Sequence, residues 1–263
     1  MAKGKELATR KAADVSTEVE DFLTEHAGEG HESLGSGGYE IPRIKLLQAL
    51  SPEVDEGLGK SGQFFNPITQ TAFDGPMTVI PCLRDEVVLE FRDRKSGGGF
   101  FGTHPVSQIK EVGATKNDKG QWEIPGSDNH YLVETFRFYV LVASDDGTWQ
   151  PAELSMKISS AKIARRWNTL SSGQMLTTSD GKLVQAPLFG FTYTLSSVKE
   201  KNRKNEPYHN WGVSVGEKVG SRELVEQAIE FRKMIEAGVV QTAEDDLEEV
   251  TRAKTGPTDS NEF

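Results

Sequence analysis

The residues best suited to chemistry in this sequence are basic side chains that alternate with aromatic ones. Single-stranded nucleic acid presents phosphates, which attract Lys and Arg, and unpaired bases, which stack on aromatic rings for about 1–3 kcal/mol each. Two runs of β-branched and aromatic residues, Leu188–Ser196 and Tyr208–Val215, predict a β-hairpin. The segment between them holds the basic residues Lys199, Lys201, Arg203 and Lys204. The alternative is an ordinary hairpin with a solubilising loop.

Three other stretches place basic or aromatic side chains where a polyanion could reach them. The glycine-rich stretch 92–129 contains Arg92, Arg94, Lys95, Phe100 and Phe101. Two expected strands present Arg137, Tyr139 and Lys157 outward, and an expected helix presents Lys162, Arg165 and Arg166. Tyr208 and Trp211 stand beside the basic tip. The aromatic residues of the tip and of the glycine-rich stretch either stack on bases or pack onto the domain.

Motifs for enzymatic chemistry are weak. Gly97–Gly102 formally matches GxGxxG, but Thr-His-Pro follows where a dinucleotide site needs the start of a helix. The five histidines are scattered and Cys82 is the sole cysteine, so no zinc-ligand spacing occurs. Glu153 and Lys157 lack the tighter Glu-x-Lys spacing of a nuclease site. We therefore expect no enzymatic activity, no metal and no cofactor.

The formal net charge of −10 is distributed unevenly over the 263 residues. Residues 1–40 carry nine acids and four bases, and residues 241–263 carry seven acids and two bases. The segment between them is neutral, with 24 acids and 24 bases. The acidic overall balance therefore does not exclude a polyanion as the partner of the middle segment.

Composition also indicates the compartment. A single cysteine excludes an internal disulfide, and no apolar run is long enough to span a membrane. The basic start MAKGKELATRK lacks the apolar segment of a signal peptide. We expect the protein to be cytoplasmic, in the cytoplasm of the host cell if it is viral, with no membrane partner. The sequence leaves open whether it forms a homo-oligomer.

The chain divides into three segments by composition. Residues 1–38 read as a flexible acidic arm with one short helix candidate between Thr17 and Gly28. Residues 39–240 carry the apolar patterns of one folded domain. Residues 241–263 read as a disordered acidic tail.

Period-two alternation predicts strands at Met77–Phe91, Tyr131–Ala143 and Trp149–Ile158. The first strand should bend near Pro81, and a long irregular insertion, Arg92–Asn129, should follow it. In the second strand the alternation turns the following side chains outward: Tyr131, Thr135, Arg137 and Tyr139.

Two helices are predicted. The first begins after Ser159 or Ser160 and carries an apolar stripe of Ile163, Trp167 and Leu170, which assigns Trp167 to the core. The second covers Ser221–Ala237, after the hairpin.

Three strands, a helix and two strands occur in the order of an oligonucleotide-binding (OB) barrel. The expected fold is mainly β: an OB-like five-stranded barrel with a helix between strands 3 and 4 and a C-terminal helix. Such a barrel binds its ligand on strands 2 and 3 and on the loops after strands 1 and 4. The basic and aromatic residues named above fall at these places.

The C-terminal segment is acidic and closes with Asp259, Glu262 and Phe263. An acidic tail that ends in phenylalanine resembles the tails of the single-stranded-DNA-binding proteins of T7-like bacteriophages and of bacteria. The resemblance implies that the tail docks replication or recombination partners and competes with DNA for a basic groove. The acidic run at Glu244–Glu249 lies away from the terminus, unlike the pattern of those tails.

The resulting hypothesis is a non-enzymatic protein that binds single-stranded DNA without sequence preference in phage replication or recombination. Strand annealing would leave the same sequence pattern. The alternative is a protein-interaction or virion structural protein whose aromatic loops contact protein and whose acidic ends only solubilise it.

Overall fold

The computed structural model describes residues 19–26, 29, 39–202 and 204–242, and only the backbone of Tyr39, Arg94 and Gln241. Arg203, the tail residues Asp259, Glu262 and Phe263, and most of the N-terminal arm lie outside the described residues. Within the arm, residues 19–25 are helical, as the short helix candidate predicted.

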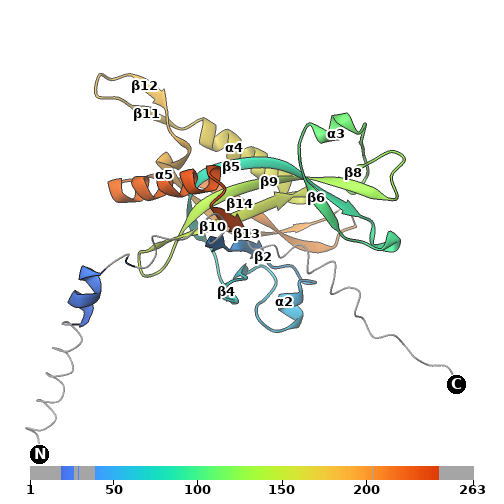
Figure 1. The fold of residues 1–263 in the computed structure, drawn as a ribbon, viewed down its shortest axis with the longest axis horizontal. Helices are drawn as coiled ribbons and strands as arrows, with labels where there is room; N and C mark the ends of the chain where they lie inside the picture. The colour runs from blue at the N-terminus through green and yellow to red at the C-terminus, as the bar shows by residue number, and fades with distance from the viewer. Residues whose placement is uncertain (1–18, 27–28, 30–38, 203, 243–263) are drawn as a thin grey trace, which may run out of the picture.

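The described chain is mainly β, as expected, and most of its strands form one large curled sheet with helices against it (Figure 1). Two further pairs, β1 with β15 and β11 with β12, form separate two-stranded sheets. The strands are β1 Tyr39–Ile41, β2 Arg43–Leu46, β3 Phe64–Asn66, β4 Thr71–Phe73, β5 Met77–Arg92, β6 Phe100–Pro105, β7 Thr115–Lys116, β8 Trp122–Glu123, β9 His130–Ala143, β10 Trp149–Lys157, β11 Met175–Thr177, β12 Leu183–Gln185, β13 Phe191–Lys201, β14 Pro207–Lys218 and β15 Val240–Thr242. The helices are α2 Pro52–Asp55, α3 Gln108–Glu111, α4 Ala161–Ser172 and α5 Arg222–Glu236, with 3-10 turns η1 Arg94–Ser96, η2 Ile158–Ser160 and η3 Leu188–Gly190.

The main sheet has 11 strands rather than the expected five. Its path is β14-β13-β5-β9-β10-β2-β3-β4, with β6 paired to β5, and β8 to β9. The bend predicted in the first long strand is present, since the β5 register shifts between Pro81 and Leu83. The strand predicted to end at Ile158 ends at Lys157, and Ile158 is exposed, with a positive φ of 53°.

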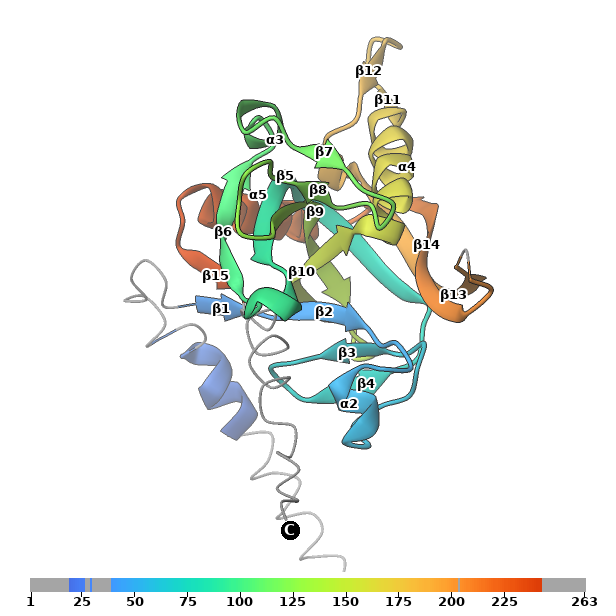
Figure 2. The ribbon, with the colours of Figure 1, turned by 90° about the vertical axis from the view of Figure 1, so that its right-hand side faces the viewer.

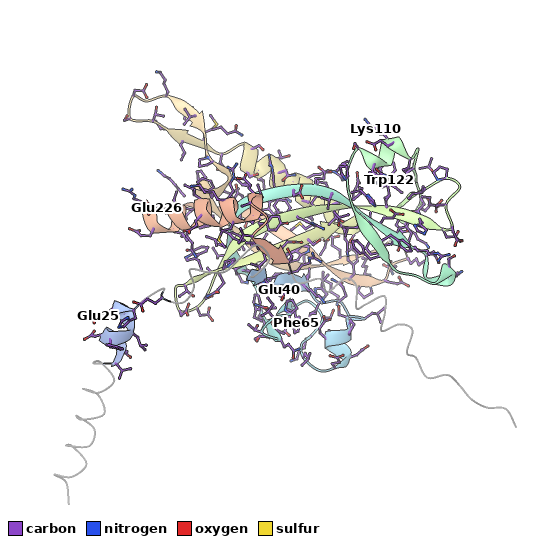
Figure 3. The ribbon with its side chains drawn as sticks, in the orientation of Figure 1. Glu25, Glu40, Phe65, Lys110, Trp122 and Glu226 are labelled. Atoms are coloured by element: carbon purple, nitrogen blue, oxygen red, sulfur yellow. The ribbon has the colours of Figure 1, made fainter. Side chains whose placement is uncertain are left out.

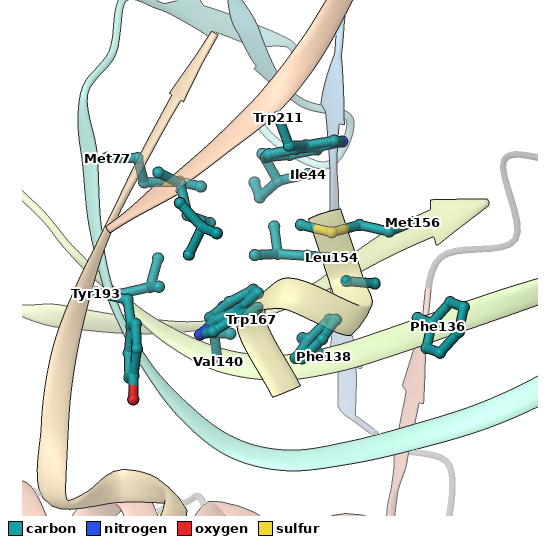
Figure 4. Close-up of a cluster of buried hydrophobic side chains, with 14 of the residues drawn as sticks. Ile44, Met77, Phe136, Phe138, Val140, Leu154, Met156, Trp167, Tyr193 and Trp211 are labelled. Atoms are coloured by element: carbon teal, nitrogen blue, oxygen red, sulfur yellow. The ribbon is translucent and has the colours of Figure 1, made fainter. Parts of the chain in front are cut away.

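The main core lies inside the curl of the sheet, where α4 packs against it (Figure 4). Trp167 is fully buried and stacks on Phe138, with ring centroids 4.2 Å apart and planes at 15°. Its other neighbour is the ring of Tyr193, at 5.7 Å. The prediction that Trp167 belongs to the core is therefore confirmed.

A second apolar layer covers part of the outer face of the sheet, where α5 lies. Ala228 and Phe231 of α5 pack on Ile80, Cys82 and Leu141. Burial raises the pKa of the Cys82 thiol to about 12, so this thiol stays protonated and unreactive at neutral pH.

A buried carboxylate joins β2 and the last strand, β15, to β10 in the middle of the main sheet. Glu153 in β10 is fully buried; its Oε1 lies 2.9 Å from Nε of Arg43, and its Oε2 accepts a hydrogen bond of 2.7 Å from Thr242. Arg43 stands opposite Glu153 in the parallel β2–β10 pair, and β15 pairs with β1. The described fold thus extends to Thr242, two residues past the expected end of the domain.

The side chain of Gln48 links two strands that are not neighbours in the sheet, β2 and β14. The amide of Gln48, just after β2, donates to the His209 carbonyl of β14 and accepts from the His209 N–H, each at 2.9 Å. A neighbouring strand would make the same two hydrogen bonds through its backbone, so the Gln48 side-chain amide takes the place of a peptide group beside β14. The His209 ring lies on Gly62, where φ is 94° and a Cβ would come within 2.5 Å of the ring.

The insertion after the first long strand is ordered, which corrects the expectation of an irregular segment. It contains β6, α3, β7 and β8, and Ile109 packs with Val88 and Leu132 in a small core of its own. Trp122 packs against this core, in the same lobe as Lys110 (Figure 3). The elements of the insertion are only two to six residues long, too short for helical or strand periodicity to identify them in the sequence.

The basic hairpin is anchored by Glu200 of β13. This carboxylate accepts hydrogen bonds from Tyr208 at 2.5 Å, Lys162 at 2.9 Å and Asn210 at 3.1 Å. Ser160 donates to the same Asn210 at 2.9 Å, so η2, α4 and the hairpin meet here. The hydrogen bond from Tyr208, followed by those from Lys162 and Asn210, lowers the pKa of Glu200 from 4.5 to about 2.

Within the described residues no helix is both long and apolar enough to cross a lipid bilayer.

Replacing Trp167 by alanine should lower the free energy of unfolding by about 3–5 kcal/mol, because it empties a buried aromatic site. Trp167→Phe should cost less, since it retains a ring against Phe138. Arg166→Ala, an exposed change on the same helix, should stay within about 0.5 kcal/mol of the parent. Urea unfolding monitored by circular dichroism measures all three, and an unchanged midpoint for Trp167→Ala would refute this assignment.

Glu200→Gln should destabilise the protein in a pH-dependent way. The pKa of Glu200 is lower in the folded protein than its ordinary value, so the carboxylate stabilises the fold above about pH 4.5 and loses this effect as the pH falls toward 2. The difference in unfolding free energy between parent and variant should shrink over that range. Glu230→Gln, on the exposed surface of α5, is the control. A difference that is independent of pH would contradict the role of the charge.

Candidate nucleic-acid interface

Three aromatic rings lie side by side at one end of the outer face of the sheet. The register places Phe100 of β6 opposite Phe91 of β5, and Phe91 opposite Tyr131 of β9. The Phe91 ring centroid lies 5.7 Å from that of Phe100 and 5.9 Å from that of Tyr131. All three are partly exposed. Rings that are fixed and partly exposed can stack on unpaired bases at little entropic cost.

Cationic side chains continue along the same face. Lys157 of β10 pairs in register with Thr135, and its Nζ lies 6.0 Å from the centroid of the Phe91 ring. Arg137 stands two residues further along β9, opposite Ser155. Its Nε is buried without a hydrogen-bond partner. Thr135, expected outward between these residues, is fully buried.

A groove of about 420 Å³ opens beyond these cations, between β2, the end of β10 and β14. Three cationic side chains line it: Arg43, Lys45 and Lys157. Ser155, Ser159, Ser160, Tyr208 and His209 line it too. The hydroxyls of Ser160 and Tyr208 already donate to Asn210 and Glu200, which leaves Ser155 and Ser159 as the hydroxyl donors for a ligand. Hydroxyl, imidazole and cationic groups together are the donors that bind phosphate oxygens. The one carboxylate among the lining residues is Glu53, which holds Lys45 at 2.9 Å.

The basic hairpin lies next to this groove. Lys199 and Lys201 belong to β13, which runs further than expected, so the tip is only residues 202–206. Lys199 pairs in register with His209 of the groove. Both lysines and Lys204 are exposed, and none makes an ion pair within the described residues. Asn202 fixes the tip, because its Oδ1 accepts from the N–H groups of Lys204 and Glu206.

Two aromatic candidates are more enclosed than expected. Trp211 is 5% exposed and stacks on Phe64 at 5.3 Å in the core, although it also forms part of the wall of the groove. Tyr139 packs in the layer under α5, where burial and then the charge of Glu153 raise its pKa. Parity placed Tyr139 on the correct face of the sheet, but α5 covers that part of the face.

The pair Phe100 and Phe101 is split between the two faces. A register shift at this point leaves Phe100 on the aromatic face, whereas Phe101 lies against His130 at 4.3 Å and is 53% exposed. Arg92 stands opposite His130 and pairs with Asp128. Lys95 is exposed in η1, and the Arg94 side chain lies outside the described part.

The basic residues of α4 have separate environments. Lys162 is bound to Glu200 beside the hairpin. Arg165 lies over the Phe136 ring at 5.1 Å and 3.3 Å from Glu134, which also holds Lys116. Arg166 is exposed. The structure therefore brings Lys162 to the hairpin and leaves Arg165 beside the insertion.

Several residues of this face were not among the predicted contacts: Phe91, Tyr131, Arg43, Lys45 and His209. The signal for Tyr131 was present, since alternation placed it outward with Arg137. Arg43 and Lys45 alternate with Ile44 and Leu46, but so short a run did not distinguish a strand from a helix.

A carboxylate bound by two imidazoles lies on the opposite face. Glu90 Oε2 is 2.8 Å from His104 Nε2, and Glu90 Oε1 is 2.7 Å from His130 Nδ1. The described residues contain no group of three or more His, Cys, Asp or Glu side chains arranged to hold a metal ion.

Comparison with known proteins gives one match. A family model described as Pam3 phage gp34-like protein matches residues 10–241, which include all described residues of the candidate interface. No curated protein and no solved structure matches the chain. The description names a phage protein and states no activity. Since the match covers most of the sequence, the chain belongs to the Pam3 phage gp34-like protein family.

Proposed function

We propose that this protein binds single-stranded DNA without sequence preference, as a non-enzymatic component of phage replication or recombination. The observation that carries the proposal is that one side of the sheet has stacked rings at one end, cations further along and a groove beside a basic hairpin at the other end. A single strand needs both kinds of contact, because its bases stack and its phosphates pair.

The strand order supports an OB-like reading of the fold. Within the larger sheet, five long strands follow each other as β14-β13-β5-β9-β10, and α4 lies between the third and fourth of them in sequence. Numbered along the chain, this is the order 5-4-1-2-3 of a Greek-key OB barrel. The proposed face then lies on strands 2 and 3, between the loop after strand 1 and the hairpin of strands 4 and 5, where such barrels bind oligonucleotides.

The proposed path runs from the aromatic end to the hairpin. Bases stack on Phe100 and Tyr131, with the Phe91 ring between them, and the next phosphates meet Lys157 and Arg137. The strand then enters the groove, where serine hydroxyls and Lys45 hold the phosphate oxygens, and leaves past Lys199 and Lys201. None of these contacts reads a base edge, so binding is independent of sequence.

The C-terminal residues have a separate role in this proposal. They follow Thr242, which is anchored to Glu153, and carry Asp259, Glu262 and Phe263. We assign to them capture of replication or recombination proteins and competition with DNA for the basic face. Such a protein works in the cytoplasm of the host cell, and strand annealing would use the same face.

The test of this function is a fluorescence titration with labelled dT and rU oligomers at several salt concentrations. Affinity should fall steeply with salt, with a log–log slope of about −0.7 for each phosphate neutralised. Absence of binding at micromolar protein, or binding that salt does not alter, would favour a protein-interaction or virion structural role instead.

Variants locate the binding on the proposed face. Reversal of Lys199, Lys201 and Lys204 to Glu should weaken binding and reduce the salt slope by about 2. The matched control reverses Arg222, Arg232 and Lys233 on α5, with the same change in net charge. Tyr131→Ala should lose about 1–3 kcal/mol of binding energy, whereas Tyr131→Phe should retain it. Equal effects of the hairpin and α5 reversals would mean that only net charge matters.

Truncation after Thr242 tests the competition by the acidic tail. Removing residues 243–263 should tighten DNA binding, more at low salt than at high salt, because the competition is electrostatic and is screened beyond about 10 Å at 0.1 M salt. The cut leaves Thr242 in place, so the carboxylate of Glu153 keeps both partners and the melting temperature should not change. Unchanged affinity at every salt concentration would show that the tail only aids solubility.

A further inference from the structure

A second feature has no role in the proposed DNA site: the hairpin of β11 and β12. These strands form a two-stranded sheet that pairs with no other strand of the described chain. Figures 1 and 2, seen from two directions, both show this hairpin projecting from the body of the protein beyond the end of α4. We refer to residues 174–186 as the arm; it is distinct from the acidic N-terminal arm of residues 1–38.

The arm is held firmly at its base. The N–H of Ala186 donates to the Gln174 carbonyl at 2.9 Å, and the Gln185 amide donates to the carbonyl of Ser172 in α4, also at 2.9 Å. At the tip, the Thr178 N–H donates to the Lys182 carbonyl at 2.9 Å. The arm is therefore a defined hairpin rather than a loose connection.

Apolar side chains are exposed on both faces of the arm. Met175 is 46% exposed, Leu183 68% and Val184 43%. The register pairs Leu183 with Thr177 on one face and Val184 with Leu176 on the other. A two-stranded hairpin alone is at best marginally stable in water, and three or more strands with a shared apolar face are needed for independent stability. Within the described part of the chain, the arm has no third strand that would complete such a face.

The charge of the arm indicates what it contacts. Its charged residues are Asp180 and Lys182, which pair with each other at 2.8 Å. The arm is neutral, although the whole chain carries −10. Two copies can therefore approach through their arms with little repulsion, whereas a polyanion is not attracted to them.

We propose that the arm pairs with the same arm of a second copy of this chain, β12 beside β12 about a two-fold axis. Two hairpins then form a four-stranded sheet, the β12 edges gain hydrogen-bond partners, and Leu183 and Val184 of each copy gain cross-strand neighbours. The interface is small, so we expect the dimer to be reversible. This inference does not depend on DNA binding.

Sedimentation equilibrium of the full chain without DNA tests the proposal. The parent should show a reversible monomer–dimer equilibrium. Leu183→Asp and, separately, Val184→Asp should each weaken it by about tenfold or more. Leu50→Asp is the matched control, because Leu50 is 91% exposed on the loop after β2. Melting temperatures should be unchanged, since the arm lies outside the main core.

A covalent test fixes the geometry. Leu183→Cys under mild oxidation should give a disulfide-linked dimer, while Leu58→Cys, also exposed, should not; the native Cys82 is buried and does not interfere. A parent that stays monomeric at all concentrations would overturn the proposal. An unchanged dimer in both aspartate variants would also overturn it. If the aspartate variants lost DNA binding while the sedimentation mass stayed that of the parent, the proposal would also be overturned, and the arm would be assigned to DNA instead.

Discussion

The buried carboxylate of Glu153 is the constraint on which the arrangement of this fold depends. A charge without water costs several kcal/mol unless it is paired and hydrogen-bonded, and removing one partner from such a pair typically costs 3–5 kcal/mol. Glu153 obtains its partners from the two ends of the domain, Arg43 after β1 and Thr242 in β15. This requirement places β2 beside β10 and keeps β15 next to β1.

The position of β2 in turn creates the groove. In a five-stranded barrel, the hairpin strand β14 would pair with the free edge of β10. Here β2 occupies that edge, so β14 lies beside the end of β2 instead. The two are joined through the side-chain amide of Gln48 rather than a full ladder of peptide hydrogen bonds. A seam with so few backbone contacts leaves space between the strands. Arg43 and Lys45, carried in by the intervening strand, supply cations to that space.

Patterns within a single element predicted much of this structure. They failed where contacts with segments far away in the sequence determine the burial or pairing of a residue. Alternation located β5, β9 and β10, and the helical stripe placed Trp167 in the core, because each signal lies within one element. The outward position of Tyr139 was correct, but only the docking of α5, some 90 residues later, covers it. Arg43 was missed because its strand is short and pairs in parallel with a segment 110 residues away. The path of β13 to Lys201 exceeded expectation because Glu200 and Tyr208 extend the pairing beyond the apolar run.

The pairing of some cations with carboxylates decides which side chains of this acidic protein could attract a polyanion in the proposed way. Arg43, Lys45 and Lys162 are already held by carboxylates, so a phosphate would have to share or displace Glu153, Glu53 or Glu200 and would gain little net Coulomb energy. Lys199, Lys201 and Lys204 have no such competitor within the described chain. The hairpin lysines should therefore supply most of the electrostatic attraction and its salt dependence. In the proposed complex, the paired cations of the groove would fix the position of the strand, and the aromatic face would contribute the part of the affinity that salt does not alter.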